Sequence, residues 1–129
     1  MTQSTILLIE DNEQNRYLLT FLLEKSGYRV LSVADGPGGI EVARTFVPAL
    51  ILLDIQLPTM DGYAVARALR QNDALERIHI VAVTSYAMPG DREKAIEAGC
   101  TGYIEKPIDP ETFVAELELV LARPPGGDP

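Results

Sequence analysis

Acidic residues follow directly after two apolar runs of this 129-residue sequence. Glu10 and Asp11 come after residues 6–9, and Asp54 comes after residues 50–53. If these runs are neighbouring strands, three carboxylates crowd one place, and two charges about 4 Å apart repel by roughly 4 kcal/mol at an effective dielectric of 20. Protonation or a hard divalent cation such as Mg²⁺ can relieve that repulsion, and both alternatives stay open at this point.

Two further apolar runs lead to groups that suit a phosphoryl group. Thr84, a hydroxyl donor, follows residues 80–83, and Lys106 comes shortly after the weaker run 102–104. An ammonium group suits a phosphoryl oxygen as a point charge. Phosphoryl transfer needs a metal, donors to the equatorial oxygens and an in-line nucleophile. A carboxylate such as that of Asp54 can be this nucleophile and become an acyl phosphate.

Each of these residues also has an ordinary structural interpretation. Asp11 can cap a helix, Thr84 can be a β-branched strand residue and Lys106 can be a solvated surface lysine. Asp54 can belong to a turn, although the residues after it supply turn chemistry of their own. Polar residues at four strand ends of one sheet edge fit a shared site better than separate coincidences.

The elements that would position these residues alternate along the chain. Short apolar runs rich in Ile, Leu and Val are typical of strands buried on both faces, and they lie at residues 6–9, 30–33, 50–53, 80–83 and 102–104. Segments of helical periodicity lie between them, and Gly27 and Gly99 stand where helices would end. Repeated strand–helix units predict an α/β fold with a doubly wound five-stranded parallel sheet. We favour the order 2-1-3-4-5, in which the strands before Glu10 and Asp54 are neighbours.

The end of the chain has a helix start and a helix stop. Asp109 followed by Pro110 predicts an N-cap and the first turn of a last helix. The final residues, "RPPGGDP", cannot continue a helix. We therefore expect one domain over residues 4–122 and a flexible tail over residues 123–129.

Composition and charge exclude several classes of protein. The net charge of −8 and the pI of about 4.5 disfavour direct binding to nucleic acid, because an acidic surface repels phosphates. The N-terminus has no basic stretch and its apolar run is too short for a signal peptide or a membrane span. The single cysteine, Cys100, rules out an internal disulfide and is expected to be a small buried hydrophobe. A soluble cytoplasmic protein is the expectation.

The ordered set of motifs resembles the receiver domain of two-component response regulators. The acidic pair comes first, Asp54 follows with "IQLPTMDG" after it, and "VTS" and "KP" come next, all in the order and at the spacing of that family. A single "KP" or "DG" would be weak, whereas the ordered set is very specific. The resemblance extends over about residues 4–121 and implies the (βα)5 flavodoxin-like receiver fold.

The resemblance implies a role for each acidic residue. Asp54 would accept a phosphoryl group from a sensor histidine kinase or a histidine phosphotransfer protein. Asp11 would bind Mg²⁺ directly, Glu10 would help to hold it, and Asp54 and the backbone carbonyl of Gln56 would complete the protein ligands. The chain would then be a phosphorylation-activated switch and not an enzyme beyond its own Mg²⁺-dependent phosphorylation and dephosphorylation.

The resemblance also implies roles at the last two strands. Thr84 and Lys106 would contact the phosphoryl group, and Tyr103 would be an aromatic switch whose ring turns inward as Thr84 moves. Tyr103 can also be a strand aromatic that packs on the last helix. The peptide bond between Lys106 and Pro107 is expected to be cis.

The loop after Asp54 adds three expectations. Pro58 and Gly62 would shape this loop, with Gly62 supplying backbone freedom. Gln56 lends only its carbonyl to the metal, so its side chain would be free to tune the chemistry. Together with Tyr86, it would restrict the attacking water and set the lifetime of the phosphoryl group. Alanine at position 86 should then change the hydrolysis rate.

Other functions and contexts remain as alternatives. A Mg²⁺-dependent phosphohydrolase usually has a second acid close after its nucleophile, whereas this chain has Gln56, which cannot shuttle a proton. A flavodoxin-like electron carrier would need a phosphate loop rich in Ser, Thr and Gly after the first strand, and the sequence has none.

The end of the sequence after the fifth helix predicts a stand-alone response regulator without a DNA-binding output domain. Its downstream partner would bind the surface of the fourth helix, fifth strand and fifth helix, about residues 90–121. Residues 85–100 resemble single-domain chemotaxis and cell-division regulators and also receivers of hybrid histidine kinases, so an excised domain is the alternative. Pro89 departs from the basic residue expected there. We expect a monomer, with a weak dimer as the alternative.

Overall fold

The strands and helices alternate as predicted in the computed structural model, which describes residues 4–58, 60–85 and 88–123. The strands are β1 (Thr5–Ile9), β2 (Arg29–Val33), β3 (Leu50–Asp54), β4 (His79–Thr84) and β5 (Gly102–Glu105). They pair in parallel in the order β2-β1-β3-β4-β5. The predicted doubly wound α/β fold and its strand order are confirmed.

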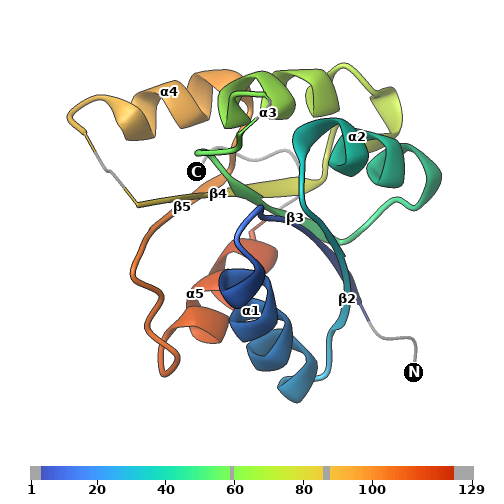
Figure 1. The fold of residues 1–129 in the computed structure, drawn as a ribbon. Helices are drawn as coiled ribbons and strands as arrows, with labels where there is room; N and C mark the ends of the chain where they lie inside the picture. Colours follow the sequence, from blue (N-terminus) through green and yellow to red (C-terminus); the bar gives the residue numbers. More distant parts are fainter. Residues whose placement is uncertain (1–3, 59, 86–87, 124–129) are drawn as a thin grey trace.

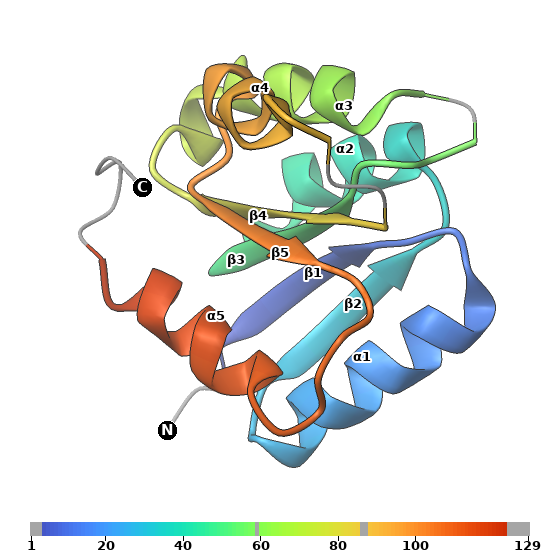
Figure 2. The same cartoon turned by 90° about the vertical axis from the view of Figure 1, so that its left-hand side faces the viewer.

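Helices cover both faces of the sheet. They are α1 (Glu13–Lys25), α2 (Gly36–Thr45), α3 (Gly62–Arg70), the short 3-10 helix η1 (Asp73–Leu75), α4 (Asp91–Ala98) and α5 (Phe113–Leu121). Figure 1 shows α1 and α5 on one face and α2, α3 and α4 on the other. Figure 2 views the sheet from the side of β5, with α4 above this strand and α5 below it. No helix in the described part of the chain is long and apolar enough to cross a membrane.

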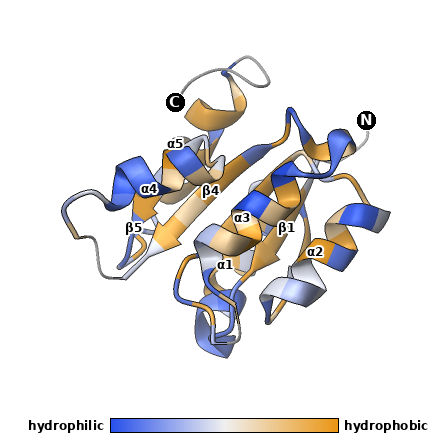
Figure 3. Cartoon of the chain, turned by 90° about the horizontal axis from the view of Figure 1, so that it is seen from above, coloured by the Kyte–Doolittle hydropathy of each residue, from blue (hydrophilic) through white to orange (hydrophobic). Residues whose placement is uncertain are grey.

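The core consists of two apolar clusters separated by the sheet. Residues of β1 alternate between them, with Leu7 and Ile9 in the cluster under α2, α3 and α4, and Ile6 and Leu8 in the cluster under α1 and α5. Both faces of β1 are therefore buried, which explains why its sequence shows no polar alternation. Figure 3 shows the result, with hydrophobic residues concentrated on the strands and hydrophilic ones on the outer faces of the helices.

The predicted helix ends are confirmed in part. Gly99 ends α4 with φ of +108°, as predicted. The cap of α1 is not Asp11 but Asn12, whose side chain accepts a hydrogen bond from the backbone of Asn15. The predicted start at Asp109 is wrong. The carboxylate of Asp109 accepts from the backbone of Glu111 in a turn, and α5 begins only at Phe113.

The end of α5 is tied to the sheet. Arg123, where we expect the tail to begin, donates from Nη1 to the carbonyl oxygen of Thr101 at 2.7 Å. Its own carbonyl oxygen lies 3.3 Å from Nε2 of His79. The rest of the expected tail, residues 124–129, lies outside the described residues. This end of α5 is therefore packed against the amino ends of β4 and β5.

Candidate active site

Three carboxylates meet at the carboxyl ends of β1 and β3. Asp54 is the last residue of β3, and Glu10 follows directly after β1, whose Ile9 lies opposite Leu53 in the sheet. Glu10 and Asp54 are only 1% and 4% exposed, whereas Asp11 is exposed. One carboxylate oxygen from each of the three acids lies within 4.8 Å of the others. The strand order thus brings together the acids that the sequence separates by more than forty residues.

Lys106 is the cation of this cluster. Its Nζ lies 2.8 Å from Oε1 of Glu10 and 3.5 Å from Oδ2 of Asp54. Its backbone N donates to the carbonyl oxygen of Thr84 at 2.7 Å, and its peptide bond to Pro107 is cis. In this structure Lys106 therefore contacts both buried acids with its single charge. Its expected contact with a phosphoryl group stays a prediction.

Burial and mutual contact shift the pKa values of the two buried acids in opposite directions. Burial, and then the hydrogen bond with Glu10, raise the pKa of Asp54 to about 7. Burial opposes ionisation of Glu10 too, but hydrogen bonds with Asp54 and Lys106 outweigh it and lower the pKa of Glu10. Without a metal, the pair is thus relieved by a proton that Asp54 carries.

The donor set at this edge of the sheet also fits a hard divalent cation. Carboxylate oxygens are the ligands that Mg²⁺ prefers, and it typically takes one or two of them together with waters and phosphate oxygens. Asp11 is exposed and can therefore bind an ion that enters from solvent. Proton and cation are alternative ways to balance the same charge, so the two predictions from the sequence are compatible.

Arg16 holds the loop that carries the acidic pair, and none of the motifs predicted from the sequence includes it. Its Nη1 donates to the carbonyl oxygens of Glu10 and Asp11, both at 2.9 Å. The signal that could have found it is its position in the first turns of α1, four residues after the cap Asn12. Arg16 thus fixes the main chain on which the two acids stand.

Gln56 is bound through both its main chain and its side chain. Its backbone N donates to Oδ1 of Asp54 at 2.8 Å. Its Nε2 donates to Oγ1 of Thr84 at 2.6 Å, and its Oε1 accepts from the backbone of Ser85 at 2.9 Å. The side chain is therefore tied to β4 and the loop after it. Its expected role in tuning the chemistry stays a prediction. Tyr86, its expected companion, lies outside the described residues.

The geometry agrees with a comparison against protein families. The family model of the response regulator receiver domain matches residues 6–118. The chain belongs to this family. Receiver domains are signalling switches that phosphorylation controls, and they act with histidine kinases or phosphotransfer proteins and with downstream partners. That general function applies to this receiver.

Relatives of this receiver include both signalling proteins and solved structures. The polar-differentiation response regulator DivK of Brucella ovis is 40% identical over 121 residues, which cover 94% of this chain and 98% of the relative. The DivK of Brucella anthropi is 39% identical over 117 residues, covering 91% of this chain and 95% of the relative.

Two solved structures share the fold closely. The receiver domain of the sensor histidine kinase PA1611 from Pseudomonas aeruginosa has a TM-score of 0.87 at 34% identity, covers 95% of this chain and 100% of that one, and holds a magnesium ion in its active-site cleft. The chemotaxis protein CheY4 of Vibrio cholerae has a TM-score of 0.89 at 26% identity, with 92% of this chain and 99% of that one covered.

Tyr103 lies in β5, between the carboxyl end of the sheet, where the candidate site lies, and its amino end. Its ring is half-buried against the core, and its hydroxyl group is buried without a hydrogen-bond partner among the described residues. The guanidinium carbon of Arg92 lies 5.2 Å from the centroid of the ring. Burial, and then the charge of Asp91, raise the pKa of Tyr103. Its role as a switch stays a prediction.

Gly62 is needed for a reason other than the one we predicted. Its φ is not positive, so backbone freedom is not what the position requires. A Cβ atom at Gly62 would overlap the backbone of Ile55 and lie 2.8 Å from the carbonyl oxygen of Asp54. The start of α3 thus packs directly on the strand end that carries Asp54. Pro58 is exposed in the same loop.

Proposed function

We propose that Asp54 accepts a phosphoryl group in this receiver. The observation that carries the proposal is the buried cluster in which Asp54 and Glu10 meet Lys106 at the end of a rigid strand. A carboxylate held still beside a cation is oriented for in-line attack on phosphorus. Burial also excludes much of the water that would compete with it.

Mg²⁺ is the cofactor that this proposal requires. Asp11, Asp54 and the backbone carbonyl of Gln56 would hold it, and Glu10 would assist. When bound, the ion neutralises charge that develops on the phosphoryl oxygens. The magnesium in the receiver of PA1611 supports this assignment, as do the oxygens of the three acids within 4.8 Å of one another.

The transfer itself uses groups of this chain. A carboxylate oxygen of Asp54 forms a bond to phosphorus as the bond from phosphorus to the imidazole nitrogen of the donor breaks, and the imidazole keeps the electron pair. Lys106 and Thr84 then donate to the phosphoryl oxygens. Hydrolysis of the acyl phosphate is slow, because Gln56 cannot serve as the acid or base that a phosphohydrolase has near its nucleophile. This favours a switch over an enzyme that turns over.

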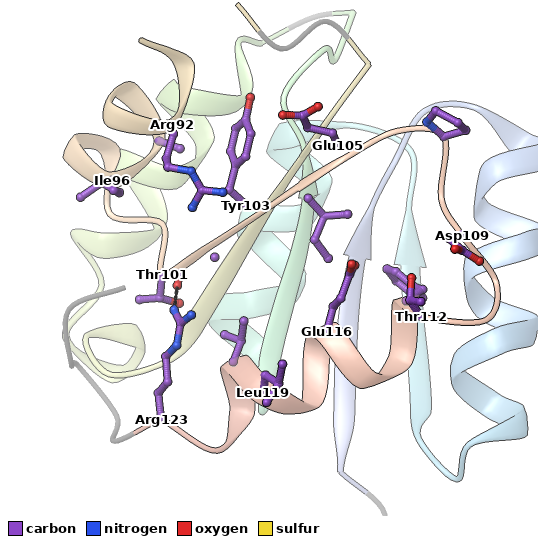
Figure 4. Close-up of a pocket in the computed structure, with 16 residues that line it drawn as sticks. Arg92, Ile96, Thr101, Tyr103, Glu105, Asp109, Thr112, Glu116, Leu119 and Arg123 are labelled. Atoms are coloured by element: carbon purple, nitrogen blue, oxygen red, sulfur yellow. Dashed lines mark hydrogen bonds between the residues drawn. The ribbon is translucent and has the colours of Figure 1, made fainter. Parts of the chain in front are cut away.

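The downstream partner would bind the face formed by α4, β5 and α5. This face has a groove of about 590 Å³, and Figure 4 shows the side chains that line it. Ile96 of α4 and Leu119 of α5 are 44% and 70% exposed there. Because Tyr103 also lines this groove, a movement of its ring would change the surface that the partner contacts.

Labelling with a small phosphodonor tests the proposed acceptor. We expect wild-type protein, incubated with acetyl phosphate and Mg²⁺, to gain one base-labile phosphoryl group in its intact mass, and Asp54→Asn to gain none. Asp73→Asn is the matched control, because it makes the same chemical change at an exposed position in η1. It should be labelled like the wild type.

Two results would contradict the proposal. Equal labelling of wild type and Asp54→Asn would exclude Asp54 as the acceptor. Continuous release of phosphate at high turnover would favour the phosphohydrolase alternative.

A further inference from the structure

The side chain of Gln56 joins two segments that flank the proposed phosphoryl site. Its Nε2 donates to Oγ1 of Thr84 at 2.6 Å, and its Oε1 accepts from the backbone N of Ser85 at 2.9 Å. A backbone N–H can only donate, so the oxygen of the amide must face Ser85 and its nitrogen must face Thr84. The amide is therefore held at both ends, and its two partners fix its orientation.

The main chain of the same residue contacts the acceptor. The backbone N of Gln56 donates to Oδ1 of Asp54 at 2.8 Å. Gln56 thus connects the carboxylate on β3 with the hydroxyl group at the end of β4. Thr84 is 1% exposed, so its side chain has little room to reorient while the amide holds it.

We propose that Gln56 is a positioning residue that clamps Thr84 and Ser85 in the unphosphorylated arrangement and so opposes the switch. This inference rests on the proposed function, in which Thr84 donates to the phosphoryl group. If the hydroxyl group of Thr84 moves towards that group while the backbone of Ser85 stays in place, the 2.6 Å contact lengthens unless the amide follows, and an amide that follows leaves Ser85. Phosphorylation therefore breaks at least one of the two hydrogen bonds of the clamp.

The clamp differs in kind from the role we expected for Gln56, which was to restrict the attacking water. A residue that restricts water changes the rate of hydrolysis, whereas the clamp changes the equilibrium between two arrangements of the protein. Loss of a hydrogen bond present only in the unphosphorylated arrangement should strengthen binding of a phosphoryl mimic roughly 2–10-fold.

The test compares wild type with Gln56→Met, which keeps the length of the side chain and removes both of its hydrogen bonds. Beryllium fluoride at saturating Mg²⁺ is the probe, because it binds a carboxylate as a mimic of the phosphoryl group. We expect its half-saturating concentration, followed by amide NMR signals, to be roughly 2–10-fold lower for Gln56→Met. Gln71→Met makes the same change at an exposed position after α3 and should match the wild type.

The same substitution in a protein that lacks the Thr84 hydroxyl group separates the clamp from other effects of Gln56. If Gln56 acts through Thr84, most of the gain should disappear when Gln56→Met is made in a Thr84→Ala protein. A gain of the same size in that background would overturn the proposal. An unchanged or higher half-saturating concentration for Gln56→Met alone would overturn it too.

Two further outcomes would exclude the clamp for other reasons, an effect on the metal or a failure of the proposed function. If Gln56→Met changes the affinity for Mg²⁺ alone by the same factor, the effect arises at the metal and the clamp is excluded. If wild-type protein does not bind beryllium fluoride, or binds it as Asp54→Asn does, the proposed function fails and the clamp fails with it. The wild-type titration alone distinguishes this last case from a failure of the clamp.

Discussion

Buried polar side chains lie at both ends of the sheet, beside the first and the last residue of β4, and the two groups differ in charge balance. At the amino end, Nδ1 of His79 lies 3.0 Å from Oγ1 of Thr101, and its Nε2 lies 3.3 Å from the carbonyl oxygen of Arg123. The hydroxyl group of Thr101 also accepts from the backbone of Ile80 at 3.1 Å. Each of these buried groups has a partner, and no carboxylate takes part in these contacts.

At the carboxyl end, two buried acids share one cation. Glu10 and Asp54 both contact Lys106, and the pKa of Asp54 rises to about 7. A buried network that satisfies itself stabilises the fold, whereas one with surplus charge marks a place where a ligand can bind. The comparison therefore separates a structural network at the amino end of the sheet from a functional site at its carboxyl end. Substitution of Thr101 should lower the stability and leave labelling of Asp54 unchanged, whereas substitution of Asp54 should abolish labelling.

The largest expected effect on stability is at the amino end. Thr101→Val keeps the shape of the side chain but leaves His79 and the backbone N of Ile80 without their hydroxyl partner. We expect the free energy of unfolding in urea to fall by about 3 kcal/mol, while labelling at Asp54 below the unfolding transition stays at the wild-type level. Thr112→Val, at an exposed residue without a side-chain capping bond, is the control and should change stability little.

Loss of labelling in folded Thr101→Val would contradict the separation of the two ends. It would mean that the network around His79 and Thr101 supports the site across the length of β4.

The fold and the meeting of the acids were predictable because they depend on patterns that local sequence carries. Apolar runs without alternation indicated buried parallel strands, and a parallel sheet brings its carboxyl ends to one edge. With β1 and β3 as neighbours, the sequence predicts that Glu10 and Asp54 lie close together at that end of the sheet.

What the sequence did not reveal depends on contacts between distant segments. The bond from Gln56 to Thr84 joins residues 28 positions apart, and the contact of His79 with Thr101 joins residues 22 apart. Such pairs have no fixed spacing, since loop length and side-chain packing decide them. Gly62 was predicted to matter for its backbone freedom, and that reason was wrong. The overlap of a Cβ atom at this position with Ile55 can be seen only in the folded structure.

The next expected effect is a pH dependence of the free energy of unfolding, and it arises from Asp54 at the carboxyl end of the sheet. Folded protein holds a proton on Asp54 up to about pH 7, whereas the unfolded chain releases it near the ordinary value of 3.8. The folded state thus binds more protons in between, so without metal the free energy of unfolding should fall as pH rises from about 4 to 7. The lowered pKa of Glu10 acts below its ordinary 4.5 and largely outside this window.

Asp54→Asn should flatten that slope, because the amide has no proton to release. We expect a difference from wild type on the order of 1–2 kcal/mol between pH 5 and 7, measured by urea unfolding in EDTA. Asp73→Asn, at an exposed acid, should keep the wild-type slope. Parallel slopes in wild type and Asp54→Asn would show that Asp54 is ionised throughout this range.

A smaller effect is expected at Arg16, which supports the acidic loop. Arg16→Lys keeps the charge but shortens the side chain, so its ammonium group does not reach the position from which Nη1 donates to both carbonyl oxygens. We expect the dissociation constant for Mg²⁺ to rise several-fold, up to about tenfold, in a calorimetric titration. Arg29→Lys, at an exposed residue of β2, is the control. An unchanged constant would show that the loop keeps its shape without Arg16.

The smallest effect lies between the two ends, on β5. Thr101 precedes this strand and Lys106 follows it, so the ring of Tyr103 stands between the structural network and the site. The guanidinium carbon of Arg92 lies 5.2 Å from the centroid of that ring, and a partly exposed pair of this kind contributes about 0.5–1 kcal/mol. A double-mutant cycle with Arg92→Met and Tyr103→Leu should give a coupling energy of that size in urea unfolding, whereas Arg77→Met with Tyr103→Leu should give none. A contact this weak can hold the ring in place without phosphate and still yield to a movement of Thr84, so a coupling of several kcal/mol would argue against Tyr103 as a switch.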